Sequence, residues 1–140
     1  GGATAGLRVC IGAPESLHPS RSVLDAAQQI AAQTGGGAEV CTDPVAACQG
    51  ADVIATDVWA SMGQEALHAE RQVVLEPYRL DQAKLSVANP GCLVLHCLPA
   101  HRGEEISADV IDGPNSVVWE QAENRLHAQK ALISWLLEQP

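Results

Sequence analysis

The sequence is short of basic residues and contains no long hydrophobic run. Only 8 Lys and Arg residues stand against 17 Asp and Glu, which gives a formal net charge of -9 and an isoelectric point near 4.8. Because so acidic a surface repels phosphate backbones and anionic lipid, we expect neither nucleic acid nor a membrane among the partners. No apolar stretch approaches the ~20 residues that span a bilayer, and the first residues lack the basic and apolar regions of a secretory signal.

Motifs for metal and nucleotide binding are also missing. The five cysteines include no C-x-x-C pair, so a structural zinc site has little support. Neither a G-x-G-x-x-G fingerprint nor a Walker phosphate loop occurs, which argues against the usual nucleotide sites. Because these motifs are missing, we expect no metal or cofactor. Because the number of cysteines is odd and four of them lie among apolar neighbours, we expect a reduced, cytoplasmic protein.

What is present is the composition of a folded domain. Hydrophobic residues make up 46% of the 140 residues and the mean hydropathy is +0.02, which argues against disorder and indicates one compact core. The periodicity predicts strands at 7–13, 38–42, 52–56, 92–97 and 116–119, and helices at 20–34, 43–50, 64–75 and from 121 onward. Apolar strands that alternate with helices predict an α/β, Rossmann-like three-layer sandwich with a mostly parallel sheet covered on both faces.

Capping residues support several of these boundaries. The first helix stops at a run of glycines, and Asp43 followed by Pro44 is typical of an N-cap and the first helical position. Ala3 to Gly6 resemble the end of a helix that leads straight into a strand, with Gly6 in the C′ position. We therefore expect one domain over residues 1–140, truncated at its N-terminus, with a preceding strand and helix absent.

Three polar clusters follow predicted strands. They are TDVWASMGQE (56–65), HCLPAHRGEE (96–105) and EQAENRLH (120–127). Since the carboxyl ends of parallel strands share one edge of the sheet, where ligands bind, we expect the clusters to converge there. Pro99 after Leu98 predicts a tight chain reversal that presents backbone carbonyls within the second cluster.

Cys97 is the candidate functional thiol of the second cluster, and a buried filler at the end of a strand is the alternative. His96, His101 and Arg102 surround it in sequence, and nearby cations favour the thiolate form of a cysteine. His96, Cys97 and His101 could instead be metal ligands. Neighbouring residues of a strand point to opposite faces, so at most two of the three converge without a sharp turn, and we predict no metal.

Asp57 is the candidate carboxylate of the first cluster. A turn or cap role is common at such a position. The functional alternative is that Asp57 binds an amine while Ser61, Met62 and Gly63 form a small loop that closes over the ligand.

Arg125 is the candidate cation of the third cluster. We expect it near the N-terminus of the last helix, where its charge and the helix dipole both favour an anion. A surface ion pair with Glu120 or Glu123 is the alternative at this spacing.

Taken together, the three clusters resemble segments of a known protein family. DVWASMGQE, HCLPAHRGEE and EQAENRLHAQKAL resemble, in order and spacing, signature segments of the ornithine carbamoyltransferase family, in its C-terminal, ornithine-binding domain. The resemblance covers essentially all 140 residues. It implies transfer of a carbamoyl group from carbamoyl phosphate to the side-chain amine of L-ornithine, which gives L-citrulline and phosphate in arginine biosynthesis.

The resemblance also implies roles for individual residues. Asp57 and Cys97 would carry the chemistry and, with the loop Ser61, Met62 and Gly63, would contact ornithine. Carbamoyl phosphate would contact Cys97, Leu98 and Arg125, while His96 and Pro99 complete the H-C-L-P segment.

Other motifs of the family are absent from the chain. Its S-T-R-T-type and H-P-x-Q motifs, which bind carbamoyl phosphate from another domain, do not occur here, nor does its G-D-G-x-N-N turn. We therefore expect these 140 residues alone to be inactive. The family forms trimers through that other domain, so the parent protein is expected to be a homotrimer.

Two alternatives stay open. One is a carbamoyltransferase for aspartate, acetylornithine or putrescine, although Asp57 and the S-M-G loop favour an amino acid with a side-chain amine. The other is a binding module without enzymatic activity.

Overall fold

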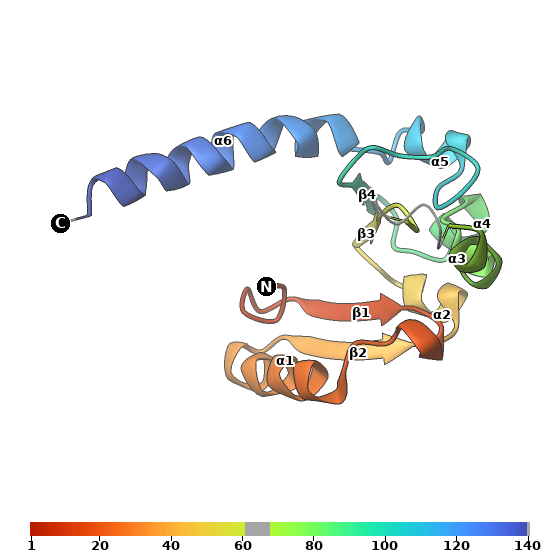
Figure 1. Cartoon of the computed structure of the whole chain (residues 1–140), viewed down its shortest axis with the longest axis horizontal. Coiled ribbons are helices and arrows are strands. Elements are labelled where there is room, and N and C mark those ends of the chain that lie inside the picture. Colours follow the sequence, from red (N-terminus) through yellow and green to blue (C-terminus); the bar gives the residue numbers. More distant parts are fainter. Residues whose placement is uncertain (61–67, 140) are drawn as a thin grey trace.

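Strands and helices alternate along the chain in the computed structural model, which describes residues 1–60 and 68–139 (Figure 1). The elements are β1 (Arg8–Gly12), η1 (Glu15–Leu17), α1 (Arg21–Thr34), β2 (Gly37–Cys41), α2 (Pro44–Cys48), β3 (Val53–Thr56), α3 (His68–Leu75), η3 (Glu76–Tyr78), α4 (Gln82–Leu85), β4 (Leu93–His96), α5 (Ala108–Ile111) and α6 (Val118–Leu137). The first four predicted strands, the helices at 20–34 and 43–50 and the last helix are confirmed within about three residues. The predicted helix at 64–75 is confirmed over His68–Leu75, and its first part, 64–67, lies outside the described residues.

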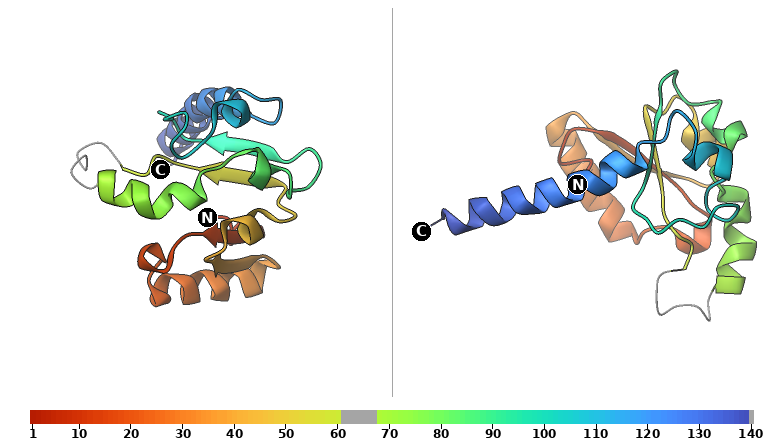
Figure 2. Two further views of the ribbon diagram at one scale, coloured as in Figure 1. Left: turned by 90° about the vertical axis from the view of Figure 1, so that its right-hand side faces the viewer. Right: turned by 90° about the horizontal axis from the view of Figure 1, so that it is seen from above.

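The described strands form two separate parallel pairs. β1 pairs with β2, with Arg8 opposite Gly37, and β3 pairs with β4, with Val53 opposite Leu93. The parallel prediction is confirmed, but the four strands are not joined into one hydrogen-bonded sheet. Figure 2 shows the two pairs from two further directions.

The predicted fifth strand at 116–119 is wrong. Ser116 makes a single bridge to Val94, and the hydrogen bond from the Val117 amide to the Val94 carbonyl is 3.0 Å long. The chain then enters α6 at Val118, three residues before the predicted helix start. Val94 makes two backbone hydrogen bonds to this segment, one to Asn115 and one to Val117. Two such bonds are too few to form a strand, and α6 begins at the next residue.

The predicted caps act as expected. Asp43 accepts hydrogen bonds from the amides of Val45 (2.8 Å) and Ala46 (3.2 Å), which satisfies two free donors at the start of α2. The chain leaves α1 through Gly35, whose φ of 79° lies in the left-handed region where a side chain is strained. Gly6, with φ of 76°, is likewise left-handed.

Burial is concentrated around β4. Six buried apolar side chains form the core cluster: Leu80, Val94, Ile106, Val110, Ile111 and Val118. In contrast, β1, β2 and β3 contain no buried residue, and the buried residues of β4, Val94 and His96, share one face of the strand. The predicted burial of both faces is therefore not found in the described strands.

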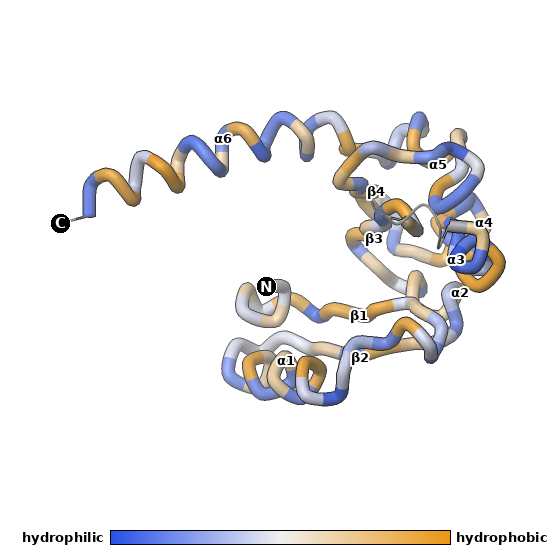
Figure 3. The backbone as a smooth tube through the Cα atoms, viewed as in Figure 1, coloured by the Kyte–Doolittle hydropathy of each residue, from blue (hydrophilic) through white to orange (hydrophobic). Residues whose placement is uncertain are grey.

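The last helix is confirmed, but its apolar residues face solvent. α6 projects away from the rest of the chain, and hydrophobic residues recur along its length (Figures 1 and 3). The residues that defined its periodicity are exposed: Leu126, Ile133, Leu136 and Leu137. Among the described residues, no helix is both long enough and apolar enough to cross a membrane.

Candidate functional site

Asp57 and Cys97 meet where β3 and β4 end. Thr56 and His96 are opposite each other in the last position of the paired strands, so the two residues that follow emerge side by side. The Cys97 thiol donates a hydrogen bond to Asp57 Oδ1 at 2.9 Å, and the same oxygen accepts one from the Val58 amide at 2.7 Å. Both side chains belong to exposed residues, so a ligand can reach them.

The thiol of Cys97 is held in its protonated form. The hydrogen bond to Asp57 raises the pKa of Cys97, and partial burial and the negative charge of Asp57 raise it further. The positive charge of Arg125 lowers this pKa, but by less than Asp57 raises it. The expected thiolate is therefore wrong for the free site, because the carboxylate is the charge that contacts the sulfur.

The cations expected around Cys97 are engaged elsewhere. Arg102 forms a bidentate ion pair with Asp112: Nη2 donates to Oδ1 at 2.7 Å and Nε donates to Oδ2 at 2.9 Å. His101 Nδ1 lies 3.7 Å from a carboxylate oxygen of Glu104. Two of the three cations that neighbour Cys97 in sequence, His101 and Arg102, thus face carboxylates of other residues once the loop is folded.

His96 forms a buried hydrogen-bond network with Glu105. Both side chains are 0% exposed. The Leu98 amide donates to His96 Nδ1 at 2.9 Å, so this nitrogen is an acceptor and the proton lies on Nε2. Nε2 then donates to Glu105 Oε1 at 3.1 Å, and the same oxygen accepts from the His101 amide at 2.6 Å. The network ties the two ends of segment 96–105 together.

The segment reverses direction at Leu98. Leu98 has φ of 56°, the one positive φ of a non-glycine residue in the described chain, and the Leu98–Pro99 peptide bond is cis. A left-handed leucine is unfavourable unless neighbouring contacts hold it. The hydrogen bond from its amide to His96 supplies such a contact. The predicted reversal at Pro99 is thus confirmed.

Possible metal ligands come together here, but one of them is already occupied. The ligand atoms of Asp57, His96 and Cys97 lie within 4.8 Å of one another. Both ring nitrogens of His96 hold hydrogen bonds, so a cation would have to displace the Leu98 amide or the carboxylate of Glu105.

Arg125 lies about two turns into α6, which begins at Val118, and is exposed. It is therefore beyond the first turn, where the helix dipole favours anions, and that part of the prediction is wrong. Glu123, one of the two expected partners, pairs with His127 at 3.6 Å. Arg125 is close enough to Cys97 to lower the pKa of its thiol. The predicted contacts Ser61, Met62 and Gly63 lie outside the described residues.

Two supporting residues were not identified from the sequence. Glu105, which the sequence marks only as the last residue of the second polar cluster, is fully buried. Gln121, on α6, accepts a hydrogen bond from the His96 amide at 2.9 Å and so ties the helix to the end of β4. No periodicity or spacing signals either role, because each depends on a contact between distant segments.

Comparisons with known proteins agree on one family. The model of the aspartate/ornithine carbamoyltransferase, Asp/Orn binding domain matches residues 1–136. An ornithine carbamoyltransferase from Renibacterium salmoninarum is 57% identical over 137 residues, which are 98% of this chain and 44% of the relative. One from Pyrococcus abyssi is 52% identical over 97% of this chain and 43% of its own length. The chain thus spans less than half the length of the curated relatives it matches.

Solved structures show the same fold. Ornithine carbamoyltransferase from Pyrococcus furiosus matches with a TM-score of 0.89 and 52% identity, over 95% of this chain and 42% of that one. An acetylornithine transcarbamylase complexed with acetylcitrulline matches with a TM-score of 0.83 and 29% identity, over 99% of this chain and 42% of the other. The Rossmann-like α/β class predicted from the sequence is confirmed.

Replacing Asp57 with Asn should lower the pKa of Cys97, because the charge that opposes ionisation of the thiol is removed. At pH 8 the rate of Cys97 alkylation by iodoacetamide, followed by peptide mass spectrometry, should rise several-fold, and its pH profile should shift to lower pH. Asp52→Asn, at the other end of β3, should leave the profile unchanged. An unchanged or upward-shifted profile in Asp57→Asn would contradict the assignment.

Glu105→Ala should lower the free energy of unfolding by about 3 kcal/mol, since it leaves the His96 Nε2–H and the His101 amide buried without an acceptor. Urea unfolding measures the loss. Glu105→Gln keeps one acceptor oxygen and should cost less. Glu70→Ala, at an exposed position, should change stability by less than about 0.5 kcal/mol. Equal losses in Glu105→Ala and Glu70→Ala would show that the network stabilises nothing.

Proposed function

Since the chain belongs to the aspartate/ornithine carbamoyltransferase family, we propose that residues 1–140 form the ornithine-binding domain of an enzyme that transfers the carbamoyl group of carbamoyl phosphate to L-ornithine. The products are L-citrulline and phosphate. The observation that carries the proposal is the contact of 2.9 Å between the Cys97 thiol and Asp57 at the shared end of β3 and β4. A carboxylate and an ionisable thiol side by side are suited to binding an ammonium group and removing its proton.

Amine activation follows from this pair. The side-chain ammonium of ornithine is not a nucleophile until it loses a proton, so the site must both attract it and deprotonate it. Asp57 supplies the attracting charge. The bound ammonium places a positive charge beside Cys97, which offsets the effect of Asp57 and lowers the pKa of the thiol. In this proposal the thiol releases its proton to solvent when the acceptor is bound, and the resulting thiolate then takes one proton from the ammonium, which leaves a neutral amine and a neutral thiol.

The carbamoyl side needs groups that stabilise developing negative charge. As the amine attacks, the carbonyl oxygen of carbamoyl phosphate becomes negative and the phosphate leaves. Arg125 supplies positive charge near Cys97. Cys97 and Leu98 lie at the chain reversal, where we expect them to contact carbamoyl phosphate. His96 and Pro99 hold that loop in shape. Arg125 alone is too little for phosphate binding, so further cations must come from outside these residues.

Ornithine specificity is assigned to Asp57 together with Ser61, Met62 and Gly63. Support comes from the higher identity to ornithine carbamoyltransferases, 57% and 52%, than to the acetylornithine transcarbamylase at 29%. Acetylornithine, aspartate or putrescine as the acceptor is the alternative. A binding module without catalysis is the second alternative, and it requires Cys97→Ala in the parent protein to leave the catalytic rate unchanged.

The cellular setting belongs to the same proposal. All five cysteines, each in the described part of the chain, are free thiols, which fits the reducing cytoplasm. A citrulline-forming enzyme fits arginine biosynthesis. A homotrimeric parent protein rests on the family resemblance alone.

Ornithine binding can be tested by NMR on the ¹⁵N-labelled chain. L-ornithine should shift amides near Asp57 and at 96–98, whereas L-norvaline, which lacks the side-chain amine, should shift them far less. Asp57→Asn should weaken binding about tenfold or more, which corresponds to the loss of a charge-assisted hydrogen bond of ~1.5 kcal/mol. Asp52→Asn serves as the matched control. Equal affinity for ornithine and norvaline would refute amine recognition by Asp57.

The purified chain should form no citrulline from L-ornithine and carbamoyl phosphate when no other protein is added. The reason is that Arg125 is the one cation assigned to the phosphate. Colorimetric detection of citrulline checks this. Turnover by the 140 residues alone would show that the chain already contains all the groups needed to bind the phosphate of carbamoyl phosphate.

A further inference from the structure

The last helix is attached to the rest of the chain only at its start. Of the 20 residues of α6, Val118 is buried, Gln121 is half-buried and all the others are exposed. Val118 belongs to the apolar core cluster, and the helix packs against β4. Beyond this first turn α6 leaves the molecule, as Figure 1 shows. The direction of the helix therefore depends on the contacts of its first turn.

Gln121 makes the polar contact of that turn. Its Oε1 accepts a hydrogen bond from the backbone amide of His96 at 2.9 Å. Within residues 1–60 and 68–139, this is the only side-chain hydrogen bond from α6 to another element. Burial of Val118 and the backbone hydrogen bond of Val117 hold the helix at its first residue, which by itself leaves the angle of the axis free. Gln121 adds a second point of attachment and so restricts that angle.

Arg125 lies on the same face of α6 as Gln121. Residues four apart in a helix are neighbours on one face, about 6 Å apart along the axis. Because Gln121 contacts His96, the last residue of β4, Arg125 is on the side of the helix that faces Cys97, the next residue of the chain. The positive charge of Arg125 lowers the pKa of Cys97, which agrees with this placement.

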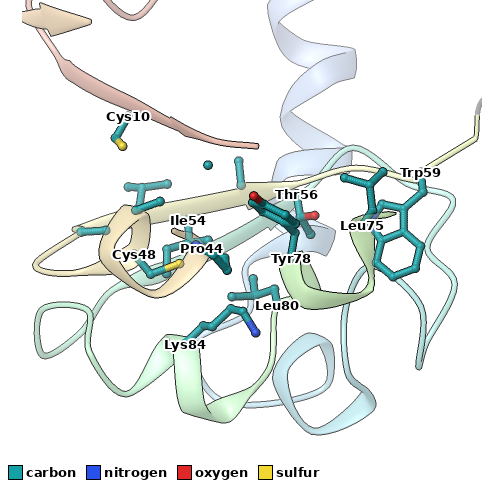
Figure 4. Close-up of a pocket in the computed structure, with 15 residues that line it drawn as sticks. Cys10, Pro44, Cys48, Ile54, Thr56, Trp59, Leu75, Tyr78, Leu80 and Lys84 are labelled. Atoms are coloured by element: carbon teal, nitrogen blue, oxygen red, sulfur yellow. The ribbon is translucent and has the colours of Figure 1, made fainter. Parts of the chain in front are cut away.

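The other cation on this side of β3 is already paired. Figure 4 shows the cavity of about 240 Å³ that extends along β3 to Trp59. Lys84, the cation that lines it, is bound to Asp81 at 3.2 Å. Arg125 forms no salt bridge with another described residue, so its guanidinium is available for an anion. Its position therefore determines whether an anion beside Cys97 meets a positive charge.

We propose that Gln121 is a positioning residue for the anion that the site binds: it fixes the angle of α6 and so holds the guanidinium of Arg125 beside Cys97. The inference rests on the proposed function, in which Arg125 serves carbamoyl phosphate, and it adds the residue that sets the place of that cation. Gln121 acts without touching either substrate. Loss of its hydrogen bond lets α6 turn about Val118, and such a turn moves Arg125, which lies ~10 Å further along the axis.

Alkylation of Cys97 by a charged and a neutral reagent tests the proposal on the 140-residue chain. Iodoacetate carries a negative charge and iodoacetamide carries none, and both react with the thiolate with loss of iodide. The ratio of the two rates at Cys97 therefore reports the charge near the sulfur and is independent of the fraction of thiolate. Peptide mass spectrometry gives this ratio, at pH 8 and low ionic strength, because salt screens exposed charges.

Gln121→Ala should lower the ratio of the iodoacetate rate to the iodoacetamide rate about twofold or more, although it leaves Arg125 in place. Arg125→Gln should lower the ratio to the same extent, which is the effect expected of two unit charges ~8 Å apart in water. The double variant should show no further decrease, because both substitutions remove the same effect. Gln129→Ala, at an exposed position about two turns further along α6, should leave the ratio unchanged.

Hydrogen exchange of the His96 amide, followed by NMR, is the second readout. Loss of the acceptor in Gln121→Ala should speed this exchange, whereas Arg125→Gln should not. If Gln121→Ala does not fold, Gln121→Met takes its place, because methionine keeps the length of the side chain and removes the acceptor oxygen.

Three results would overturn the inference: a ratio that falls in Arg125→Gln but not in Gln121→Ala, effects that add in the double variant, or unchanged exchange of the His96 amide in Gln121→Ala. Each of them leaves the proposed reaction intact. A ratio that is unchanged in Arg125→Gln would instead remove the anion-binding role of Arg125, on which the proposed function itself depends. The two failures are therefore distinguishable.

Discussion

The buried contact between His96 and Glu105 is the interaction on which the candidate site depends. A carboxylate that is 0% exposed is costly to bury, and it is tolerated here because Oε1 accepts from both the imidazole and the His101 amide. The opposite ring nitrogen holds the amide of the left-handed Leu98. One carboxylate oxygen thus joins His96 to His101, and the opposite nitrogen of the same imidazole holds the left-handed Leu98 that follows Cys97.

Electrostatics at the loop then define the state of the free site. Asp57 holds the thiol of Cys97 protonated, so a negative charge and a neutral donor face the acceptor before it binds. A cationic substrate complements this arrangement in two ways: it is attracted by Asp57, and it offsets the charge that opposes ionisation of Cys97. The same carboxylate therefore serves recognition and couples substrate binding to proton removal in the proposed reaction.

The buried apolar side chains are concentrated in one part of the molecule. The apolar core surrounds β4 and includes the first residue of α6, which places the site on the best-buried part of the chain. β1, β2 and β3 contain no buried residue.

Local signals in the sequence were sufficient for most of the elements and pointed to Asp57 and Cys97 as candidates. Apolar runs, Asp43 before Pro44, and the glycines after α1 act on neighbouring residues, so they can be read without knowing the fold. The protonated thiol, the buried Glu105 and the end of the predicted strand at 116–119 could not be read in this way. Each depends on groups that are distant in sequence: Asp57 beside Cys97, His96 beside Glu105, and Val94 beside Ser116. Charge and burial are properties of the assembled neighbourhood, and only the tertiary structure brings that neighbourhood together.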